Sequence, residues 1–215
     1  MNKNEKFVIT INRELGSGGR TIGEKLAEKL GVKFYDKALI KGLMDHYHLT
    51  VDEIEKVKGR KHNWWSDVEH MLQIGPGVTT NYYMLQTNNV SERLTTDEVF
   101  KTETMILQDI AAEASCVVAG RSGFYVFRDH PNHLSILIQA SLPCRIARVV
   151  RKQNVNEDEA RKIIAKVDEM RENYVKKYTN TSRYDTRNYD LVISMDKMTE
   201  DNAVEVIMDF INRQY

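Results

Sequence analysis

The chain has 215 residues, enough for one α/β domain with a substantial core or for one domain with a large insertion. Lysine plus arginine and aspartate plus glutamate both number 31, so no net charge draws the protein to nucleic acid or to an anionic membrane. Its two cysteines lack metal-ligand or redox spacing, and its N-terminal apolar stretch is too short for a signal peptide. We therefore expect a cytoplasmic protein that binds neither nucleic acid nor membrane. It could form a homo-oligomer.

Residues 7–35 predict a strand, a glycine-rich turn, a helix and a second strand. The β-branched run at 7–11 is typical of a strand buried on both faces of a parallel sheet. Apolar residues recur on one helical face from Thr21 onward, and Gly31 ends the predicted helix. Residues 32–35 form the second strand, so the unit predicts a right-handed parallel crossover.

The rest of the chain continues this alternation. Residues 37–113 are mostly helical by pattern, a long excursion between two core strands. Further elements are predicted in this order: strands at 116–119 and 134–138, a helix from Pro143, a helix from 156 to 178, a strand at 191–194 and a C-terminal helix. The pattern predicts one α/β domain over residues 1–215, a three-layer, doubly wound, five-stranded parallel sheet with a helical insertion between strands two and three.

The turn at Gly16-Ser17-Gly18-Gly19 carries the clearest functional signal. Its backbone can curl so that successive N–H groups point inward, and the next helix adds its positive N-terminal dipole, so the turn predicts a phosphate-binding cradle. The match to G-x-x-x-x-G-K-[ST] is incomplete in either register, because Arg20 is the one cation of the loop and lysine is absent. A dinucleotide fingerprint is an alternative, although Thr21 occupies its third glycine position, and a merely structural turn is another.

Polar residues at the strand ends are the other candidates, because ligands of such sheets lie outside the carboxyl ends of the strands. Asp36 follows strand two, Arg121 follows strand three and Ser141 follows strand four. Three further arginines recur at three-residue spacing on the next helix, without interleaved aromatic residues: Arg145, Arg148 and Arg151. We expect these three to contact phosphate or carboxylate groups within the protein rather than nucleic acid.

Several stretches together resemble the nucleoside monophosphate kinases, and within them the cytidylate-kinase-like branch. The resemblance is carried by ITINRELGSGGRTIG at 9–23, KFYDKALI at 33–40, VVAGRSGFYVF at 117–127, ILIQASLPCRIARVVRKQ at 136–153 and DEMR at 168–171. It implies a P-loop kinase fold. It also implies transfer of the γ-phosphoryl group of ATP to a nucleoside monophosphate or similar small acceptor, with Mg²⁺ bridging the phosphates.

The resemblance also implies roles for individual residues. The ATP phosphates would be held by Gly16, Ser17, Gly18, Gly19, Arg20 and Thr21, with Thr21 nearest the Mg²⁺ ion. The acceptor would be bound by Asp36, Arg121 and Asp168, and Arg171 would contact the transferring phosphate. Arg20 and Arg171 are thus the candidate catalytic residues. Residues 37–113 would form the acceptor side, and residues 156–188 a lid that brings charge when the site closes.

Departures from the family pattern leave a second function open. The aspartate that follows Gly-Arg in the family is Ser122 here, which puts the preference for cytosine in doubt. The loop lysine is absent, so the alternative is a nucleotide-binding regulatory protein of the same fold with little or no kinase turnover. Arg121 could also pair with a nearby carboxylate instead of a ligand.

Simpler interpretations exist for the other candidates. Arg20 could form an ion pair with Glu14 or Glu24, and Asp168 and Arg171 could lie on an ordinary solvated helix face. The histidines lack acidic or cysteine partners for a metal site, so we expect them to be exposed: His46, His48, His130 and His133.

Overall fold

The computed structural model describes residues 1–37, 39–40 and 96–213. The chain forms two compact units, Met1–Phe34 together with Ser115–Tyr215, and Tyr35–Ala114. Most of the helical insertion predicted at 37–113 lies outside the described residues, and its described part includes helix α6 (Thr96–Glu113). The prediction of one domain over the whole chain stays a prediction.

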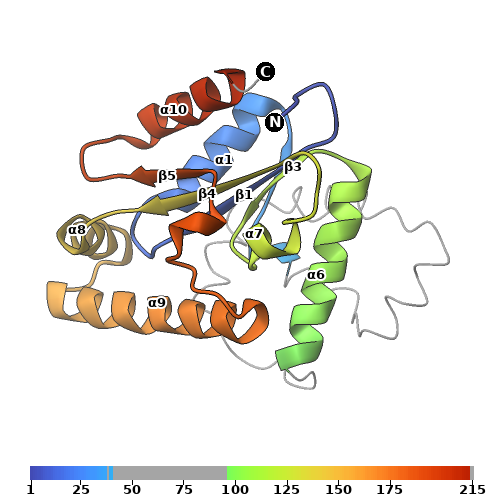
Figure 1. Cartoon of the computed structure of the whole chain (residues 1–215). Helices are drawn as coiled ribbons and strands as arrows, with labels where there is room; N and C mark the ends of the chain where they lie inside the picture. Colours follow the sequence, from blue (N-terminus) through green and yellow to red (C-terminus); the bar gives the residue numbers. More distant parts are fainter. Residues whose placement is uncertain (38, 41–95, 214–215) are drawn as a thin grey trace. The chain divides into compact units, whose positions relative to one another are not determined.

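The sheet has five parallel strands in the order β2-β3-β1-β4-β5 (Figure 1). Strand β1 is central, with β3 on one side and β4 on the other, and β5 pairs with the far side of β4. The strands are β1 (Val8–Arg13), β2 (Lys33–Tyr35), β3 (Cys116–Ala119), β4 (His133–Gln139) and β5 (Leu191–Ser194). The α/β class and the doubly wound parallel sheet predicted from the sequence are confirmed.

The register extends β1 beyond its predicted end. Ile11 is paired with Ala119, the last residue of β3, whereas Arg13 is paired with Ile138 of β4. The predicted end at residue 11 was wrong because the polar side chains of Asn12 and Arg13 interrupt the apolar run, while their backbone continues the ladder with β4. Arg13 therefore lies at the carboxyl edge of the sheet, beside the turn that follows β3.

Helices cover both faces of the sheet. Helices α1 (Gly19–Leu30) and α10 (Glu200–Arg213) lie side by side on one face (Figure 1). Their apolar residues join the strands in the main core, among them Ile22, Leu26, Ala203, Ile207 and Ile211. Helices α8 (Leu142–Gln153) and α9 (Glu157–Thr179) pack around a second apolar cluster, and α9 lies on the opposite side of the sheet from α10. These are the predicted three layers.

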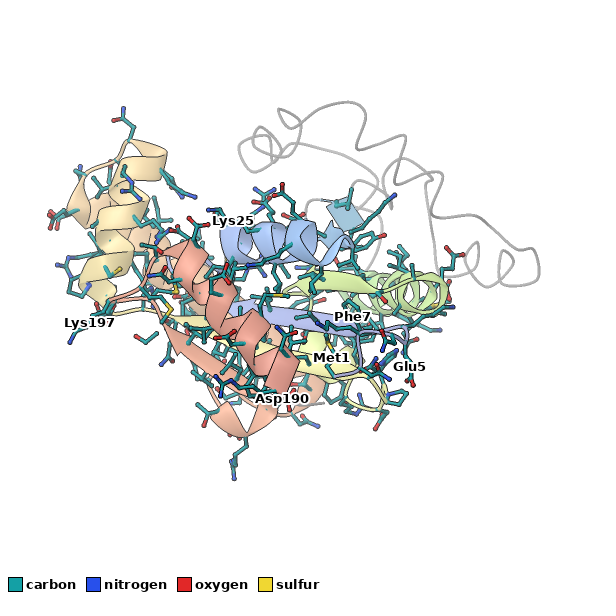
Figure 2. All side chains as sticks on the ribbon, turned by 90° about the horizontal axis from the view of Figure 1, so that it is seen from above. Met1, Glu5, Phe7, Lys25, Asp190 and Lys197 are labelled. Carbon is teal, nitrogen blue, oxygen red and sulfur yellow. The ribbon has the colours of Figure 1, made fainter. Side chains whose placement is uncertain are left out.

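Figure 2 distinguishes the two edges of the sheet in the first unit. Met1 and Phe7 lie at the amino edge, and Lys197, which follows β5, lies beyond the carboxyl edge at the other end. Lys25 on α1 lies next to α10, where its Nζ is 2.5 Å from Oδ1 of Asp201.

The long helix α9 begins as predicted and a short helix was missed. Oδ1 of Asn156 accepts the N–H of Glu159 at 2.9 Å, and the backbone N–H of Asn156 donates to Oε2 of Glu159 at 3.4 Å, which together form a capping box. Helix α7 (Gly123–Val126) follows β3 directly, and its four residues are too few to show a helical period. A 3₁₀ turn, η2 (Thr186–Asn188), precedes β5. None of the helices among the described residues is both long and apolar enough to cross a membrane.

One histidine at the amino edge departs from the expected exposure. His133 begins β4, and its Nε2 is 2.8 Å from Oγ1 of Thr10 on β1. Its ring also packs against Phe127 at 6.0 Å. Burial lowers the pKa of His133 to about 4, and the nearby Asp190 carboxylate offsets only part of that shift. The expectation of an exposed histidine is wrong here because strand pairing brings the ring against a neighbouring strand.

Candidate functional site

The turn between β1 and α1 has the backbone of a phosphate cradle. Gly16 and Gly18 have left-handed φ angles of 84° and 88°, which glycine adopts without strain. A Cβ on Gly16 would lie 2.7 Å from the carbonyl oxygen of Arg145, and a Cβ on Gly18 would lie 3.0 Å from Nη1 of Arg148. Both glycines are therefore required by backbone conformation and by the close approach of α8.

The helix that follows offers its N-terminus to an anion. The N-cap residue Gly18 makes no side-chain capping bond, and the first turn of α1 contains no acidic residue. The first N–H groups of a helix have no intrahelical acceptor and carry the positive end of the dipole. Ser17 is fully buried, and both its N–H and its hydroxyl donate to the carbonyl of Glu14, at 3.3 and 3.0 Å. Its side chain thus closes the loop.

Charged side chains of low exposure hold the backbone of the loop in place. The carboxylate of Glu14 accepts the N–H of Ala140 at 3.0 Å and lies 3.0 Å from Nη1 of Arg145. Arg145 also donates through Nε to the carbonyl of Leu15 at 2.9 Å and forms an ion pair with Asp168. Asp168 in turn accepts the N–H of Leu15 at 3.1 Å. These contacts fix both the carbonyl and the amide of Leu15.

Two more arginines reach this cluster from α9 and from the stretch after it. Arg171 donates through Nη1 to the carbonyl of Arg13 at 3.2 Å and lies 3.8 Å from Oδ1 of Asp168. Arg183 is fully buried, donates to the same carbonyl and lies 3.4 Å from the same Oδ1. Among the described residues, these three guanidinium groups thus contact the carboxylates of Glu14 and Asp168 beside the loop.

Several of these residues were absent from the sequence prediction or were interpreted differently. Asp168 is only 8% exposed, so its interpretation as part of a solvated helix face is wrong, whereas the side chain of Arg171 is 30% exposed. Arg183 was missed because it lies in a polar stretch without periodicity. Glu14 pairs with Arg145, and Arg148 pairs with Glu200, so the expected carboxylate contacts of the α8 arginines are confirmed for two of the three.

The loop cation Arg20 lies on the first turn of α1. Its Nη2 is 3.2 Å from Oε1 of Glu24 on the same helix, and the two side chains are 32% and 46% exposed. An exposed pair of this spacing contributes only about 0.3–0.5 kcal/mol, so a polyphosphate can compete with Glu24 for the guanidinium. Thr21 is partly exposed on the same turn, where its hydroxyl is suited to a metal ion bound by phosphates.

The turn after β3 is strained. Gly120, Arg121 and Ser122 are consecutive residues with φ of 81°, 55° and 52°. For a residue with a side chain this left-handed conformation costs on the order of 1–2 kcal/mol. The hydroxyl of Ser122 is buried without a hydrogen-bond partner among the described residues. Strain and an unsatisfied buried hydroxyl at a strand end are typical of a ligand site.

Aromatic packing positions the arginine of this turn. The guanidinium of Arg121 lies over the ring of Tyr174 on α9, with Cζ 5.3 Å from the ring centroid. Tyr174 packs edge-to-face against Tyr178, with centroids 5.0 Å apart. Helix α9 therefore supports both the phosphate loop, through Asp168, and the turn after β3, through Tyr174.

The side chain of Arg13 extends from the phosphate loop to the turn after β3. A Cβ on Gly19 would lie 2.6 Å from Cβ of Arg13, and a Cβ on Gly120 would lie 2.3 Å from its Nη1. The stem of Arg13 therefore crosses the start of α1, and its guanidinium lies against the turn after β3. The sequence analysis did not single out this residue.

Asp36 lies in the second unit. It is 3% exposed, and its Oδ1 accepts the N–H of Leu39 at 3.0 Å, so one carboxylate oxygen caps the turn that follows β2. Its predicted contact with an acceptor stays a prediction.

Strand order, the glycine loop after the central first strand and the uncapped helix behind it define a P-loop kinase. The sequence model of the cytidylate kinase-like family matches residues 8–197, and the chain belongs to that family. No curated protein sequence matches the chain.

Two solved structures share the fold. An uncharacterized protein from Eubacterium ventriosum is 24% identical, with a TM-score of 0.67 over 96% of this chain and 98% of that one. Shikimate kinase from Bacteroides thetaiotaomicron is 14% identical, with a TM-score of 0.50 over 96% of this chain and 98% of that one. At these identities the likeness concerns the fold.

Proposed function

We propose that this P-loop kinase transfers the γ-phosphoryl group of ATP to a nucleoside monophosphate. The observation that carries the proposal is the contact of one side chain, Arg13, with both Gly19 of the phosphate loop and Gly120 of the turn after β3. A donor cradle and a second anion-binding candidate thus lie within the span of one arginine. Phosphoryl transfer needs that proximity, because the reacting oxygen atoms must be held in line and close together.

On the donor side, residues 16–21 bind the ATP phosphates and Arg20 neutralises part of their charge. A Mg²⁺ ion is compatible with these residues. Among the described residues no group of three histidine, cysteine or acidic side chains could hold a metal ion by itself. A Mg²⁺ site would therefore consist of the Thr21 hydroxyl, phosphate oxygens and water, a common arrangement for this ion. When bound, the ion neutralises charge on the transferring phosphate.

On the acceptor side, Arg121 binds the acceptor phosphate and the buried hydroxyl of Ser122 provides a donor beside it. Asp36 and Asp168 are assigned to the acceptor by the family resemblance. Asp168 already binds the loop amide of Leu15 and three arginines, Arg145, Arg171 and Arg183, so its effect on an acceptor would pass through these arginines. Ser122 in place of the family's aspartate favours a base preference other than that of the cytidylate kinases.

The reaction balances without a net proton transfer. An oxygen of the acceptor phosphate attacks the γ-phosphorus and forms the new P–O bond. The bond between the γ-phosphorus and the β,γ-bridging oxygen breaks, and its electron pair leaves with ADP. A nucleoside diphosphate and ADP are the products. The protein contributes position and positive charge, which is most of what this reaction requires.

The test is ADP formation from Mg²⁺-ATP with a panel of acceptors: CMP, UMP, AMP, GMP, the deoxynucleotides and shikimate. We expect turnover with at least one nucleoside monophosphate, well above the ATPase background without acceptor. Turnover with shikimate alone would contradict a nucleotide as the acceptor but would still agree with kinase activity. Binding of ATP with no turnover on any acceptor would favour the nucleotide-binding regulatory protein, for which the absent loop lysine is the specific argument.

A further inference from the structure

We infer that Arg13 is a catalytic residue that supplies the positive charge of the missing loop lysine at the point of phosphoryl transfer. The inference rests on the proposed function and adds a residue that the family motifs do not single out. Its basis is where the side chain starts, where it ends and how its backbone is held.

The start of the side chain is next to the loop position where the motif lysine is replaced. In one register of the motif, Gly19-Arg20 stands in place of Lys-Gly, so the lysine position is glycine here. A Cβ on Gly19 would lie 2.6 Å from Cβ and 3.1 Å from Cγ of Arg13. Glycine at this position therefore makes room for the stem of Arg13, and the cation enters from β1 instead of from α1.

The end of the side chain is at the turn after β3. A Cβ on Gly120 would lie 2.3 Å from Nη1 and 3.4 Å from Cζ of Arg13. The glycine immediately before Arg121 thus makes room for the guanidinium. One glycine of the donor motif and one of the acceptor motif are both explained by the same side chain.

The backbone of Arg13 is held unusually firmly for a residue at a strand end. It is still paired with Ile138 in the β1–β4 ladder, and its carbonyl accepts from both Arg171 and Arg183. A charge on a fixed support stabilises a transition state without reorganising during the reaction. Charge on the transferring group spreads over its oxygens, and a planar guanidinium fork can bind two of them at once.

Arg20 differs from Arg13 in each of these respects. It projects from the first turn of α1, is 32% exposed and forms a pair with Glu24 on the helix surface. Its position suits the bound phosphates of the donor, whereas the position of Arg13 suits the group that moves. The two arginines are therefore expected to affect different kinetic constants.

The experiment compares Arg13→Met, Arg13→Lys and the wild type by kcat and by calorimetric binding of Mg²⁺-ATP. Met keeps the stem beside Gly19 and removes the charge. We expect Arg13→Met to lower kcat at least about 100-fold, as for loss of one donor to a developing charge, with the Kd for Mg²⁺-ATP within about threefold of wild type. The kcat of Arg13→Lys should lie between that of Arg13→Met and that of the wild type. Arg128→Met is the matched control, because Arg128 is exposed and stacks on Tyr125 at 4.1 Å.

A readout without turnover is the affinity for Mg²⁺-ADP with aluminium fluoride and acceptor, a mimic of the transition state. Arg13→Met should weaken this complex far more than it weakens Mg²⁺-ADP alone. Equal kcat for Arg13→Met and wild type would overturn the inference. A fall in kcat no larger than the fall in the fraction of folded protein would also overturn it. If Arg13→Met does not fold, Arg13→Gln takes its place, because it also removes the charge, and wild-type kcat with wild-type affinity for the mimic in Arg13→Gln would overturn the inference. A wild type without turnover would instead reject the proposed function, and the inference with it.

Discussion

The two edges of the parallel sheet bury polar groups in opposite ways. At the carboxyl edge, Arg145, Asp168 and Arg183 are buried and Glu14 is partly buried, each paired with another of these charged groups or with loop backbone. At the amino edge, the partly buried ring of His133 bonds to a hydroxyl, and its lowered pKa keeps it neutral. Burying charge is costly unless it is paired, and the paired charges lie at the edge where we propose that an anionic ligand binds.

Removing the carboxylate of Asp168, which Arg145 and Arg183 share, is expected to have the largest effect at the carboxyl edge. Asp168→Asn leaves Arg145 and Arg183 without their common partner in a buried position. We expect a loss of about 3–5 kcal/mol in the free energy of unfolding, the usual effect of breaking a buried ion pair. Chemical denaturation measures it. Glu205→Gln is the control, since Glu205 and Lys29 form an exposed pair and should leave stability almost unchanged. Equal effects of the two variants would mean that the cluster is not energetically linked.

The second prediction separates the exposed loop arginine from the buried ones. Arg20→Ala should weaken Mg²⁺-ATP binding and lower the transfer rate by about 100-fold, because it removes a cation from the phosphates. The loss of its partly exposed pair with Glu24 should by itself change the free energy of unfolding little. Glu24→Gln is the matched variant: it breaks the same pair, keeps the cation and should retain activity. Unchanged binding and rate in Arg20→Ala would remove Arg20 from the site.

The amino edge is tested by pH. Because the pKa of His133 is lowered to about 4 in the folded state, the unfolded chain binds a proton first as the pH falls. Stability contributed by the neutral ring is present above about pH 6.5 and is lost between pH 6.5 and 4. The full shift corresponds to roughly 3 kcal/mol, reduced by the exposed part of the ring. Denaturation midpoints of wild type and His133→Gln across this range measure it, and the variant should show the flatter profile.

The smallest expected effect concerns the strained turn at the carboxyl edge. Ser122→Gly removes a side chain from a left-handed conformation and removes a buried hydroxyl that has no partner among the described residues. We expect stabilisation by about 1 kcal/mol together with a loss of acceptor binding. Asn154→Gly is the control, since Asn154 is the exposed C-cap of α8 at a similar φ of 54°. Stabilisation by Asn154→Gly as large as by Ser122→Gly would assign the effect to backbone conformation alone.

The sequence predicted the sheet and the glycine loop because both depend on local signals. Strand β3 and strand β5 were placed at their observed bounds, since apolar runs between polar breaks define them. The ends of β1 were less predictable, because Arg13 is polar and its pairing with β4 is a long-range contact. The same holds for the candidate site. Glycines that give a turn its shape are visible in the sequence, whereas partners that approach from distant elements are not.

Arg183 and Arg13 illustrate this limit. Arg183 lies in a polar stretch that resembles a surface loop, yet it is fully buried because Asp168 and a carbonyl oxygen on β1 bind its guanidinium. Arg13 looked like the second polar residue after a strand that ends at residue 11. Only the close approach of Gly19 and Gly120 identifies the path of its side chain. A residue whose role depends on two glycines over 100 positions apart leaves no local pattern.

The central claim is that the carboxyl edge of the sheet holds both phosphates of the reaction. A crystal structure with Mg²⁺, a non-hydrolysable ATP analogue and the acceptor that gives turnover tests it most directly. We expect the triphosphate along residues 16–21 and the acceptor phosphate beside Arg121, with the guanidinium of Arg13 between them. A nucleotide bound elsewhere would contradict it, for example in the polar cavity of about 320 Å³ lined by Arg128, Ser135 and Asp190.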